Sequence, residues 1–282
     1  PFKTMTVPDE GGATRLERMR TNYKKMGLDC LFTLGGAGTH RTAALLCAEG
    51  CNVIGLPKTI DNDIYGTDVT FGFHTAVDVA TEAIDRVRTT AASHGRTILV
   101  EVMGNKAGWL TLYAGIAAGA EIILLPEIPF NIDKICETVE RNYRAGKPCN
   151  IIAVAEGAVL DSEARYKKKE RAFVRTERGE TTVTAHLAEV IEERTGAETR
   201  GTVLGYIQRG GNPSAYDRIL SSRLGSFAGK LAKEGRFGVT AAVVGREITF
   251  NALQDIAGKY KLVDPASQIV RSAEDIGICL GR

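Results

Sequence analysis

Residues 53–64 read Val-Ile-Gly-Leu-Pro-Lys-Thr-Ile-Asp-Asn-Asp-Ile, an apolar run that passes directly into an acidic loop. An α/β enzyme carries its chemistry where a buried strand ends in a loop. Residues two apart in an extended segment point the same way, so we expect Thr59, Asp61 and Asp63 to line one face of a cleft. Two carboxylates there suit proton abstraction and metal-assisted transfer. An Asx-turn is the alternative for this segment alone, because Asp-Asn-Asp is common turn chemistry.

A second junction of this kind lies upstream. Residues 31–34, Leu-Phe-Thr-Leu, run into Gly35-Gly36-Ala37-Gly38-Thr39, and an apolar helical pattern follows from 42 to 48. Glycines let a backbone approach phosphate oxygens, and the N–H groups at a helix start attract negative charge. Thr39 is expected to cap the helix or to contact a phosphate. Neither G-x-x-x-x-G-K-[ST] nor G-x-G-x-x-G occurs here, so an ordinary packing turn is the alternative.

Two further glycine-containing blocks follow strand-like runs: Val-Met-Gly-Asn-Lys-Ala-Gly-Trp at 102–109 and Gly-Tyr-Ile-Gln-Arg-Gly-Gly-Asn-Pro at 205–213. The chain order G-G-x-G-T, P-K-T-I-D-N-D, M-G-x-x-A-G, P-E-I-P-F and G-Y-I-Q-R-G-G-N-P resembles the 6-phosphofructokinase family over nearly the whole chain. The wording L-P-K-T-I-D-N-D, T-F-G-F and A-E-G-A is similar to the branch that holds pyrophosphate-dependent enzymes and related ATP enzymes.

The resemblance implies a glycolytic phosphotransferase that converts fructose 6-phosphate to fructose 1,6-bisphosphate with ATP and Mg²⁺. Asp61 matches the family's general base for the sugar 1-hydroxyl. Asp63 and Thr59 match residues that support it and contact the transferring phosphoryl group. The positions matched to the phosphoryl donor are Gly35, Gly36, Gly38, Thr39 and Lys58.

The resemblance also implies a sugar-phosphate site. Its matched positions are Met103, Gly104 and Asn105 in a loop whose backbone holds the sugar phosphate, Glu127 on the sugar hydroxyls, and Arg209 on the 6-phosphate with Tyr206 close by. Arginine suits phosphate because its planar fork binds two oxygens at once.

Two more arginines imply an assembly. Arg96 and Arg200 match arginines that reach the 6-phosphate from a neighbouring subunit, so the resemblance implies a homodimer or homotetramer with the active site at the interface. Ordinary surface ion pairs within the chain are the alternative role of both residues.

The chain departs from the family pattern at several places. Ala37 stands where an aspartate usually helps to bind Mg²⁺, and a methyl group cannot ligate a hard cation, which leaves Asp63 as the candidate metal ligand. Asn105 replaces an arginine of the best-known bacterial members, and Tyr206 replaces a histidine. The chain opens at Pro1 without the family's first βαβ segment, and we interpret it as lacking that N-terminal part.

Two residues bear on the phosphoryl donor. Pyrophosphate users in the family typically carry aspartate at the position of Gly38, where its carboxylate repels the α-phosphate of a nucleotide. Lys58 is the residue that pyrophosphate users favour, although ATP users with the same pair exist. Gly38 lacks the carboxylate that would repel ATP, whereas the positive charge of Lys58 can attract either donor. The first effect is the stronger indicator, so we expect ATP, with pyrophosphate as the alternative.

Two other functions remain open from the residues. One is a catalytically weakened paralogue that binds sugar phosphate and regulates or completes an active oligomer, which Ala37 favours. The other is a different sugar or nucleotide kinase, or an NAD-binding protein. The missing G-x-G-x-x-G and the presence of Q-R-G-G argue against NAD.

Composition agrees with an enzyme of the cytoplasm. The chain has 282 residues, 44% of them hydrophobic, and a net charge of +2. It can therefore bury a core in two domains, and the charge indicates neither a nucleic-acid partner nor a membrane surface. The six cysteines form no C-x-x-C pair and are expected to fill the core in a reducing compartment. No signal peptide or membrane-spanning apolar run is present.

The periodicity of apolar residues predicts an α/β fold with alternating elements. Strands are expected at 28–34, 52–56, 97–103, 121–126, 150–155, 201–206 and 239–244, and helices at 12–27, 40–50, 74–93, 107–119, 131–145, 181–195 and 214–233. Segment 158–180 is expected to be a loop, and the basic run 165–171 a solvated face.

By analogy with the family, we expect two doubly wound, mostly parallel sheet domains with the substrate cleft between them. The catalytic, nucleotide-side domain would comprise 1–73 and 208–262. The sugar-phosphate-side domain would comprise 74–207 and 263–282.

Overall fold

The strand that leads into the acidic loop, β2 (Val53–Pro57), is buried at every residue. Strands that are apolar throughout form the centre of parallel sheets covered on both faces. In the computed structural model, which describes residues 4–8, 11–166, 170 and 182–282, β2 lies between β1 (Leu31–Gly35) and β7 (Val239–Val244), parallel to both. The edge strand β8 (Glu247–Ala252) is antiparallel to β7. This sheet is the centre of the first of two units.

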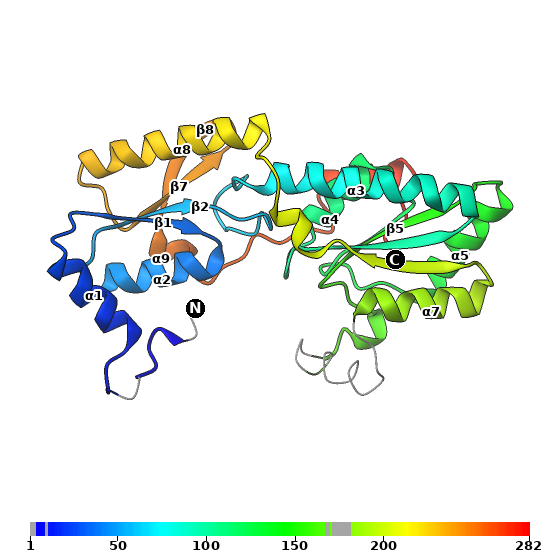
Figure 1. Ribbon diagram of the computed structural model, residues 1–282, viewed down its shortest axis with the longest axis horizontal. Helices are drawn as coiled ribbons and strands as arrows, with labels where there is room; N and C mark the ends of the chain where they lie inside the picture. Colours follow the sequence, from blue (N-terminus) through cyan, green and yellow to red (C-terminus); the bar gives the residue numbers. More distant parts are fainter. Residues whose placement is uncertain (1–3, 9–10, 167–169, 171–181) are drawn as a thin grey trace. The chain divides into compact units, whose positions relative to one another are not determined.

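Helices cover both faces of this first sheet (Figure 1). On one face α2 (Ala37–Ala48) packs against β1 and β2, together with α1 (Arg15–Lys25) and the short α9 (Leu253–Ile256). On the other face α8 (Ala215–Lys233) packs against β2, β7 and β8. The sheet is therefore doubly wound, as the alternating apolar runs predict.

The second sheet has the order β4-β5-β3-β6 and all its pairings are parallel. Its strands are β3 (Thr97–Val102), β4 (Ile122–Leu124), β5 (Asn150–Ala155) and β6 (Thr199–Val203). The helices α5 (Ile132–Arg144) and α7 (Val183–Thr195) bury apolar residues in one core against this sheet. The helices α3 (Phe73–His94) and α4 (Trp109–Ala117) lie on the opposite face, and α10 (Gln268–Asp275) is near the end of the chain (Figure 1).

The contacts divide the chain into unit 1, residues 1–74 and 213–261, and unit 2, residues 75–212 and 262–282. Residues 208–212, which the sequence analysis assigned to the first domain, group with unit 2. The prediction of two mostly parallel α/β sheets is confirmed.

Three local predictions were wrong. The helix expected at 40–50 begins at Ala37, so three residues of the predicted glycine turn form its first turn, and its N-cap is Gly36 rather than Thr39. The strand expected at 201–206 ends at Val203, and Gly205–Arg209 form a 3-10 turn. The strand β8 and the helices α9 and α10 were not predicted. Most of segment 158–180, and part of the basic run 165–171, lie outside the described residues.

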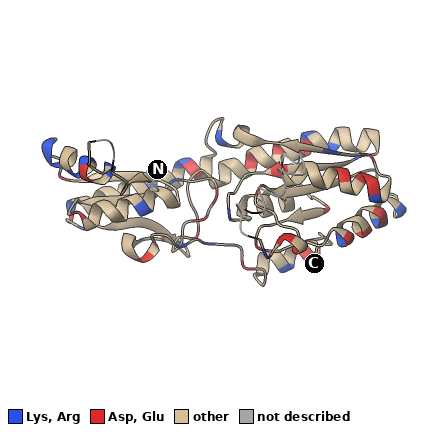
Figure 2. Cartoon of the chain, turned by 90° about the horizontal axis from the view of Figure 1, so that it is seen from below, with Lys and Arg blue, Asp and Glu red and all other residues tan. Residues whose placement is uncertain are grey.

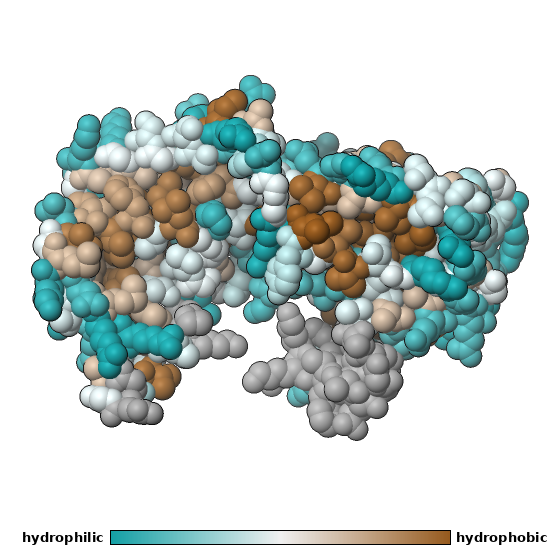
Figure 3. Space-filling view, in the orientation of Figure 1, coloured by the Kyte–Doolittle hydropathy of each residue, from teal (hydrophilic) through white to brown (hydrophobic). Residues whose placement is uncertain are grey.

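Basic and acidic residues both occur along the helices of each unit (Figure 2). Apolar residues also reach the surface of unit 1 (Figure 3). Among them are Phe32 and Leu34 of β1, 41% and 56% exposed. They point away from α2, because Leu31 packs on the α2 side of the strand. Within the described part of the chain no helix is long and apolar enough to cross a membrane.

Candidate active site

The start of α2 presents backbone N–H groups beside the acidic loop. Its N-cap is Gly36, which makes no side-chain capping hydrogen bond, and its first turn contains no acidic residue. A Cβ atom on Gly36 would lie 3.5 Å from Cβ of Thr59. The helix start therefore lies directly beside the loop that follows β2, with its positive dipole end at that edge of the sheet.

A buried histidine fixes this helix start to the sheet. The ring of His40 is 2% exposed. Its Nδ1 lies 3.0 Å from the carbonyl oxygen of Gly36, and its Nε2 lies 2.9 Å from Oγ1 of Thr240 on β7. Because a carbonyl can only accept, Nδ1 carries the proton and Nε2 accepts from the threonine. Burial lowers the pKa of His40, which favours this neutral ring.

The acidic loop is held in a bent conformation. Residues 60 and 61 bend, and Asn62 has a left-handed φ of 51°. The N–H of Asp61 donates to Oγ1 of Thr59 at 3.1 Å, a threonine-based turn. The extended alternation that predicted Thr59, Asp61 and Asp63 on one face is therefore interrupted. Asp61 is half-buried, whereas Asp63 is 2% exposed.

The segment that contains T-F-G-F supports this loop from the side. Oγ1 of Thr70 donates to the carbonyl oxygen of Thr59 at 2.7 Å, and the N–H of Thr70 donates to Oδ1 of Asn62 at 3.0 Å. The N–H of Gly72 donates to the buried carboxylate of Asp217 at the start of α8, at 2.9 Å. The loop conformation is thus set by contacts that the local sequence does not contain.

A lysine distant in sequence completes the support. The N–H of Lys261 donates to the carbonyl oxygen of Asp63 at 2.9 Å. Its Nζ donates to the carbonyl oxygens of Thr67 and Asp68, at 3.0 and 2.7 Å. Burial lowers the pKa of Lys261 to about 8, although the charges of Asp68 and Asp63 oppose the shift. Sequence reasoning missed Lys261, because no motif around it indicates a contact with the distant segment 63–68.

In unit 2, the loop after β3 has an unusual backbone. Gly104 has a φ of 150°, and a Cβ atom there would lie 2.4 Å from the carbonyl oxygen of Ala107. Only glycine fits this position without strain. Asn105 also has a positive φ, of 55°. The motif M-G-N is therefore a specific backbone shape rather than a flexible turn.

The donors of this loop are taken up by two side chains that the sequence analysis did not select. The N–H of Met103 donates to Oε1 of Gln208 at 3.1 Å. The N–H groups of Gly104 and Asn105 donate to Oε1 of Glu156, at 3.3 and 2.5 Å. Glu156 follows β5 as Met103 follows β3, and these two strands are parallel neighbours. Glu156 belongs to the motif A-E-G-A, and that motif was the sequence signal that could have identified it.

Glu127, the carboxylate that the sequence analysis selected, is engaged elsewhere in unit 2. Its carboxylate accepts from the N–H of Gly108, at the start of α4, at 2.9 and 3.1 Å, and from the N–H of Val263 at 2.9 Å. Burial raises the pKa of Glu127, and these backbone donors oppose the shift. The contacts join the loop after β4, the start of α4 and the C-terminal segment.

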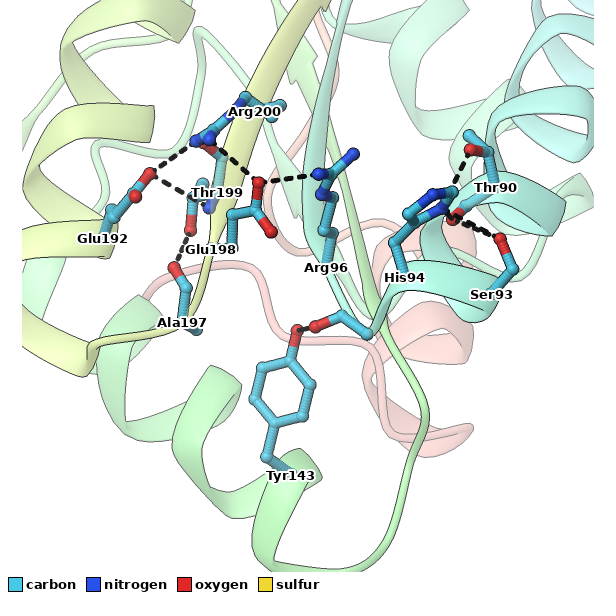
Figure 4. A network of polar contacts seen from close by, with 11 residues as sticks. Thr90, Ser93, His94, Arg96, Tyr143, Glu192, Ala197, Glu198, Thr199 and Arg200 are labelled. Atoms are coloured by element: carbon cyan, nitrogen blue, oxygen red, sulfur yellow. Dashed lines mark hydrogen bonds and ion pairs between the residues drawn. The ribbon is translucent and has the colours of Figure 1, made fainter.

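The remaining predicted residues of unit 2 lie at opposite ends of its sheet. Tyr206 and Arg209 are exposed on the 3-10 turn that follows β6. Arg96 and Arg200 lie where β3 and β6 begin, where both pair with Glu198 (Figure 4). Five residues of parallel strand, roughly 17 Å, separate the two ends. The structure thus brings Arg96 and Arg200 together, at a distance from the Met103 loop of the same unit.

The donor set of the acidic loop suits magnesium. The oxygens of Asp61, Asp63 and Thr59 are hard ligands. Within the described residues no three His, Cys, Asp or Glu side chains are arranged as a metal site. Magnesium commonly binds one or two carboxylates together with substrate phosphates, so these residues fit it as a shared ion. Ala37, the first residue of α2, offers no ligand.

A helix N-terminus beside paired aspartates, with arginines gathered elsewhere on a second α/β unit, defines a protein that handles phosphorylated ligands. The family model described as phosphofructokinase matches residues 2–232. The chain belongs to the phosphofructokinase family, which confirms the resemblance noted in its motifs.

Two curated relatives illustrate the similarity. The ATP-dependent 6-phosphofructokinase of Spirochaeta thermophila is 50% identical over 287 residues, which cover 100% of this chain and 77% of that protein. The pyrophosphate–fructose 6-phosphate 1-phosphotransferase of Amycolatopsis methanolica is 45% identical over 265 residues, which cover 93% of this chain and 76% of that protein.

Solved structures show the same fold. Phosphofructokinase from Saccharomyces cerevisiae matches with a TM-score of 0.71 at 32% identity, covering 86% of this chain and 34% of that chain. A pyrophosphate-dependent phosphofructokinase from Marinobacter aquaeolei matches with a TM-score of 0.76 at 24% identity, covering 95% of this chain and 72% of that chain. The second likeness concerns the fold alone.

Two glycines at the junction between β1 and α2 should respond differently to alanine. A Cβ atom on Gly35 would lie 2.2 Å from Oγ1 of Thr39, whereas one on Gly38 would meet nothing within 4 Å. We expect Gly35→Ala to lower the free energy of unfolding by about 1–3 kcal/mol. Gly38→Ala should leave it unchanged or raise it by up to about 1 kcal/mol. Urea unfolding measures both, and equal effects would contradict this geometry.

Lys261 should leave a signature in the pH dependence of stability. Its pKa is about 8 in the folded protein and 10.5 for an ordinary lysine. Between these values the unfolded chain binds more protons, so the free energy of unfolding rises with pH through this interval. The penalty for the buried charge is fully present below pH 8. Lys261→Met should lack this rise in urea titrations from pH 7 to 10.5, and identical slopes would show that Lys261 titrates normally.

Proposed function

We propose that this protein phosphorylates fructose 6-phosphate at the 1-hydroxyl, with ATP as the phosphoryl donor, giving fructose 1,6-bisphosphate. Membership of the family and the 50% identity to an ATP-dependent 6-phosphofructokinase support the reaction. The single observation that carries the chemistry is the contact between the N-terminus of α2 and Thr59, because it places donors for phosphate beside the aspartate loop.

Unit 1 provides the transfer residues in this proposal. The N–H groups at Gly36, Ala37 and Gly38 face the donor phosphates, with the helix dipole favouring their charge. Asp61 takes the proton from the sugar hydroxyl, since its carboxylate is half-buried while Asp63 is enclosed. Thr59 donates to the transferring group and fixes the backbone of Asp61.

Unit 2 provides the sugar-phosphate residues. Arg209 and Tyr206, both exposed after β6, contact the 6-phosphate. The loop at Met103, Gly104 and Asn105 lines the sugar-phosphate site, with its N–H groups held by Gln208 and Glu156, and Glu156 is a further candidate for the sugar because it already lies on that loop. In this proposal Glu127 contacts the sugar and also fixes the start of α4 by accepting from the N–H of Gly108.

Magnesium is the proposed metal, with Asp63 and the donor phosphates as its ligands. When bound, it neutralises charge on the phosphates during transfer. Because Ala37 supplies no carboxylate, we expect the protein to bind the ion less tightly than relatives with aspartate there. The six cysteines are free, which supports the proposed cytoplasmic location.

The position of two arginines supports a homodimer or homotetramer. Arg96 and Arg200 lie at the opposite end of the sheet from the Met103 loop of the same unit. If they bind the sugar phosphate, they bind it in another copy of the chain. A closed symmetric oligomer satisfies this requirement in every subunit.

Pyrophosphate is the alternative donor, favoured by Lys58, which is exposed directly after β2, and by the pyrophosphate-dependent relative. Gly38 favours ATP, because it is exposed in the first turn of α2 and leaves open space where an aspartate would stand. We therefore retain ATP as the donor.

The proposed base can be tested directly. Asp61→Ser should lower kcat by about 10²–10⁴-fold with little change in the KM for fructose 6-phosphate, because a base acts in the transition state. A coupled assay of the full-length protein with ATP and Mg²⁺ measures this. Asp29→Ser, which removes an exposed carboxylate of the same unit, is the control. No bisphosphate from either donor with the unmodified protein would overturn the function and favour a weakened paralogue.

The donor preference should depend on one side chain. A Cβ atom at Gly38 would meet nothing within 4 Å, and the carboxylate of Gly38→Asp should repel the α-phosphate of ATP. We expect kcat/KM for ATP to fall at least tenfold relative to that for pyrophosphate. Gly38→Asn, of the same shape but uncharged, separates charge from size. An unmodified protein that prefers pyrophosphate would show that Lys58 determines the donor.

A shared site should be restored by mixing inactive subunits. Arg96→Ala and Asp61→Ser impair different components, so an oligomer of both contains sites with an intact aspartate and an intact partner arginine. Activity should reappear when the two variants are unfolded and refolded together. Mass spectrometry verifies that mixed oligomers form, and if such oligomers stay inactive the site is not shared.

A further inference from the structure

A single carboxylate oxygen connects the two arginines at the start of the second sheet. Oε1 of Glu198 accepts from Nη2 of Arg96 at 2.8 Å and from Nη2 of Arg200 at 2.9 Å (Figure 4). Arg96 precedes β3, and Glu198 precedes β6, of which Arg200 is the second residue. The three side chains therefore meet at one edge of two neighbouring parallel strands.

The backbones of this cluster are fixed by the sheet. Thr97 pairs with Thr199, and its N–H donates to the carbonyl oxygen of Glu198 at 3.0 Å. The long arginine side chains are fixed only by their partners, since each has several rotatable bonds. Two guanidinium groups this close repel each other unless a negative charge lies between them. Glu198 supplies that charge.

A second glutamate holds Arg200 from the other side. Nη1 of Arg200 lies 2.7 Å from Oε2 of Glu192 and donates to the carbonyl oxygen of Thr199 at 2.7 Å. In the described part of the chain Glu198 is the ion-pair partner of Arg96, and the buried Nε of Arg96 makes no hydrogen bond. Glu198 is thus the contact that fixes Arg96 relative to Arg200.

The protonation states agree with this arrangement. The hydrogen bond from Arg96 lowers the pKa of Glu198, with the charges of Arg96, Arg200 and His94 adding to it. The hydrogen bond to Glu198 raises the pKa of Arg96. Both shifts favour the charged forms of Glu198 and Arg96. The guanidinium groups keep further N–H donors for an anion, because each carries five.

We propose that Glu198 is a positioning residue that holds Arg96 and Arg200 side by side as a clamp for the phosphate of the sugar substrate. The inference rests on the proposed role of the two arginines in the site of a neighbouring subunit. Glu198 does not touch the phosphate itself. It reduces the electrostatic repulsion between the two arginines and restricts their side-chain rotamers before the phosphate binds. Less free energy is then needed to order the pair during binding.

Glu198→Gln tests the inference, because it keeps the shape and removes the charge. We expect the KM for fructose 6-phosphate to rise roughly three- to thirtyfold, the loss of two partly exposed ion pairs, with kcat and the KM for ATP unchanged. Glu274→Gln, which breaks the exposed pair with Arg282 in the same unit, is the matched control. An unchanged KM would overturn the inference, and a lowered KM would show that Glu198 competes with the phosphate instead.

A second measurement separates positioning from a general structural effect. If Glu198 acts only through the arginines, Glu198→Gln should add nothing in a protein that already carries Arg96→Ala and Arg200→Ala. A further rise in KM in that background would overturn the inference. Arginine variants with an unchanged KM would overturn the proposed role of the arginines themselves, and the inference with it, while Asp61→Ser still reports on the reaction.

Discussion

The close approach of the α2 N-terminus to Thr59 is the constraint on which unit 1 depends. A Cβ atom at Gly36 would lie in ordinary van der Waals contact with Cβ of Thr59, at 3.5 Å, so the helix start packs directly on the loop. His40 maintains it by bonding Gly36 on one side and Thr240 of β7 on the other. A helix dipole and an aspartate loop thereby come to the same edge of a parallel sheet. This edge is where a phosphate can be bound and a proton removed in one place.

In unit 2, as in unit 1, the candidate site residues lie at the ends of parallel strands. Here they form two groups, one at each end of the sheet. The Met103 loop, Glu156 and the turn with Tyr206 and Arg209 all follow the carboxyl ends of parallel strands. Arg96 and Arg200 lie at the amino ends, where they are balanced by two glutamates. One chain thus carries a receptive end and a clamping end on the same sheet. The proposed oligomer, which would bring the clamping end of one copy to the receptive end of another, agrees with this division.

Much of this fold could be predicted, because buried parallel strands give continuous apolar runs such as 53–56 and 151–155. The candidate site could be predicted only where its residues are contiguous in the sequence. The strand-to-helix junction at Gly35 and the loop at Asp61 are contiguous motifs, and both lie in unit 1 as expected. The bend at Asn62 and the shift of the helix start to Ala37 could not be read from periodicity.

The residues that sequence reasoning missed share one property: their partners are distant in the chain. Lys261 contacts the segment 63–68, Glu156 contacts Asn105, and Gln208 contacts Met103. No spacing rule links such positions, and only the fold brings them together. The antiparallel strand β8 was missed for a different reason. Its two-residue turn after Val244 interrupts the alternation of strands and helices on which the assignment was based.

The measurement that tests the central claim most directly is a titration of the amide resonances of the uniformly ¹⁵N-labelled protein with a non-hydrolysable ATP analogue. The account predicts that the amides of Gly36, Ala37 and Gly38 shift strongly and saturably, because their N–H groups bind the phosphates. The amide of Gly146, after α5 in unit 2, should not move. Saturation of binding at other amides, with those three unchanged, would contradict the account.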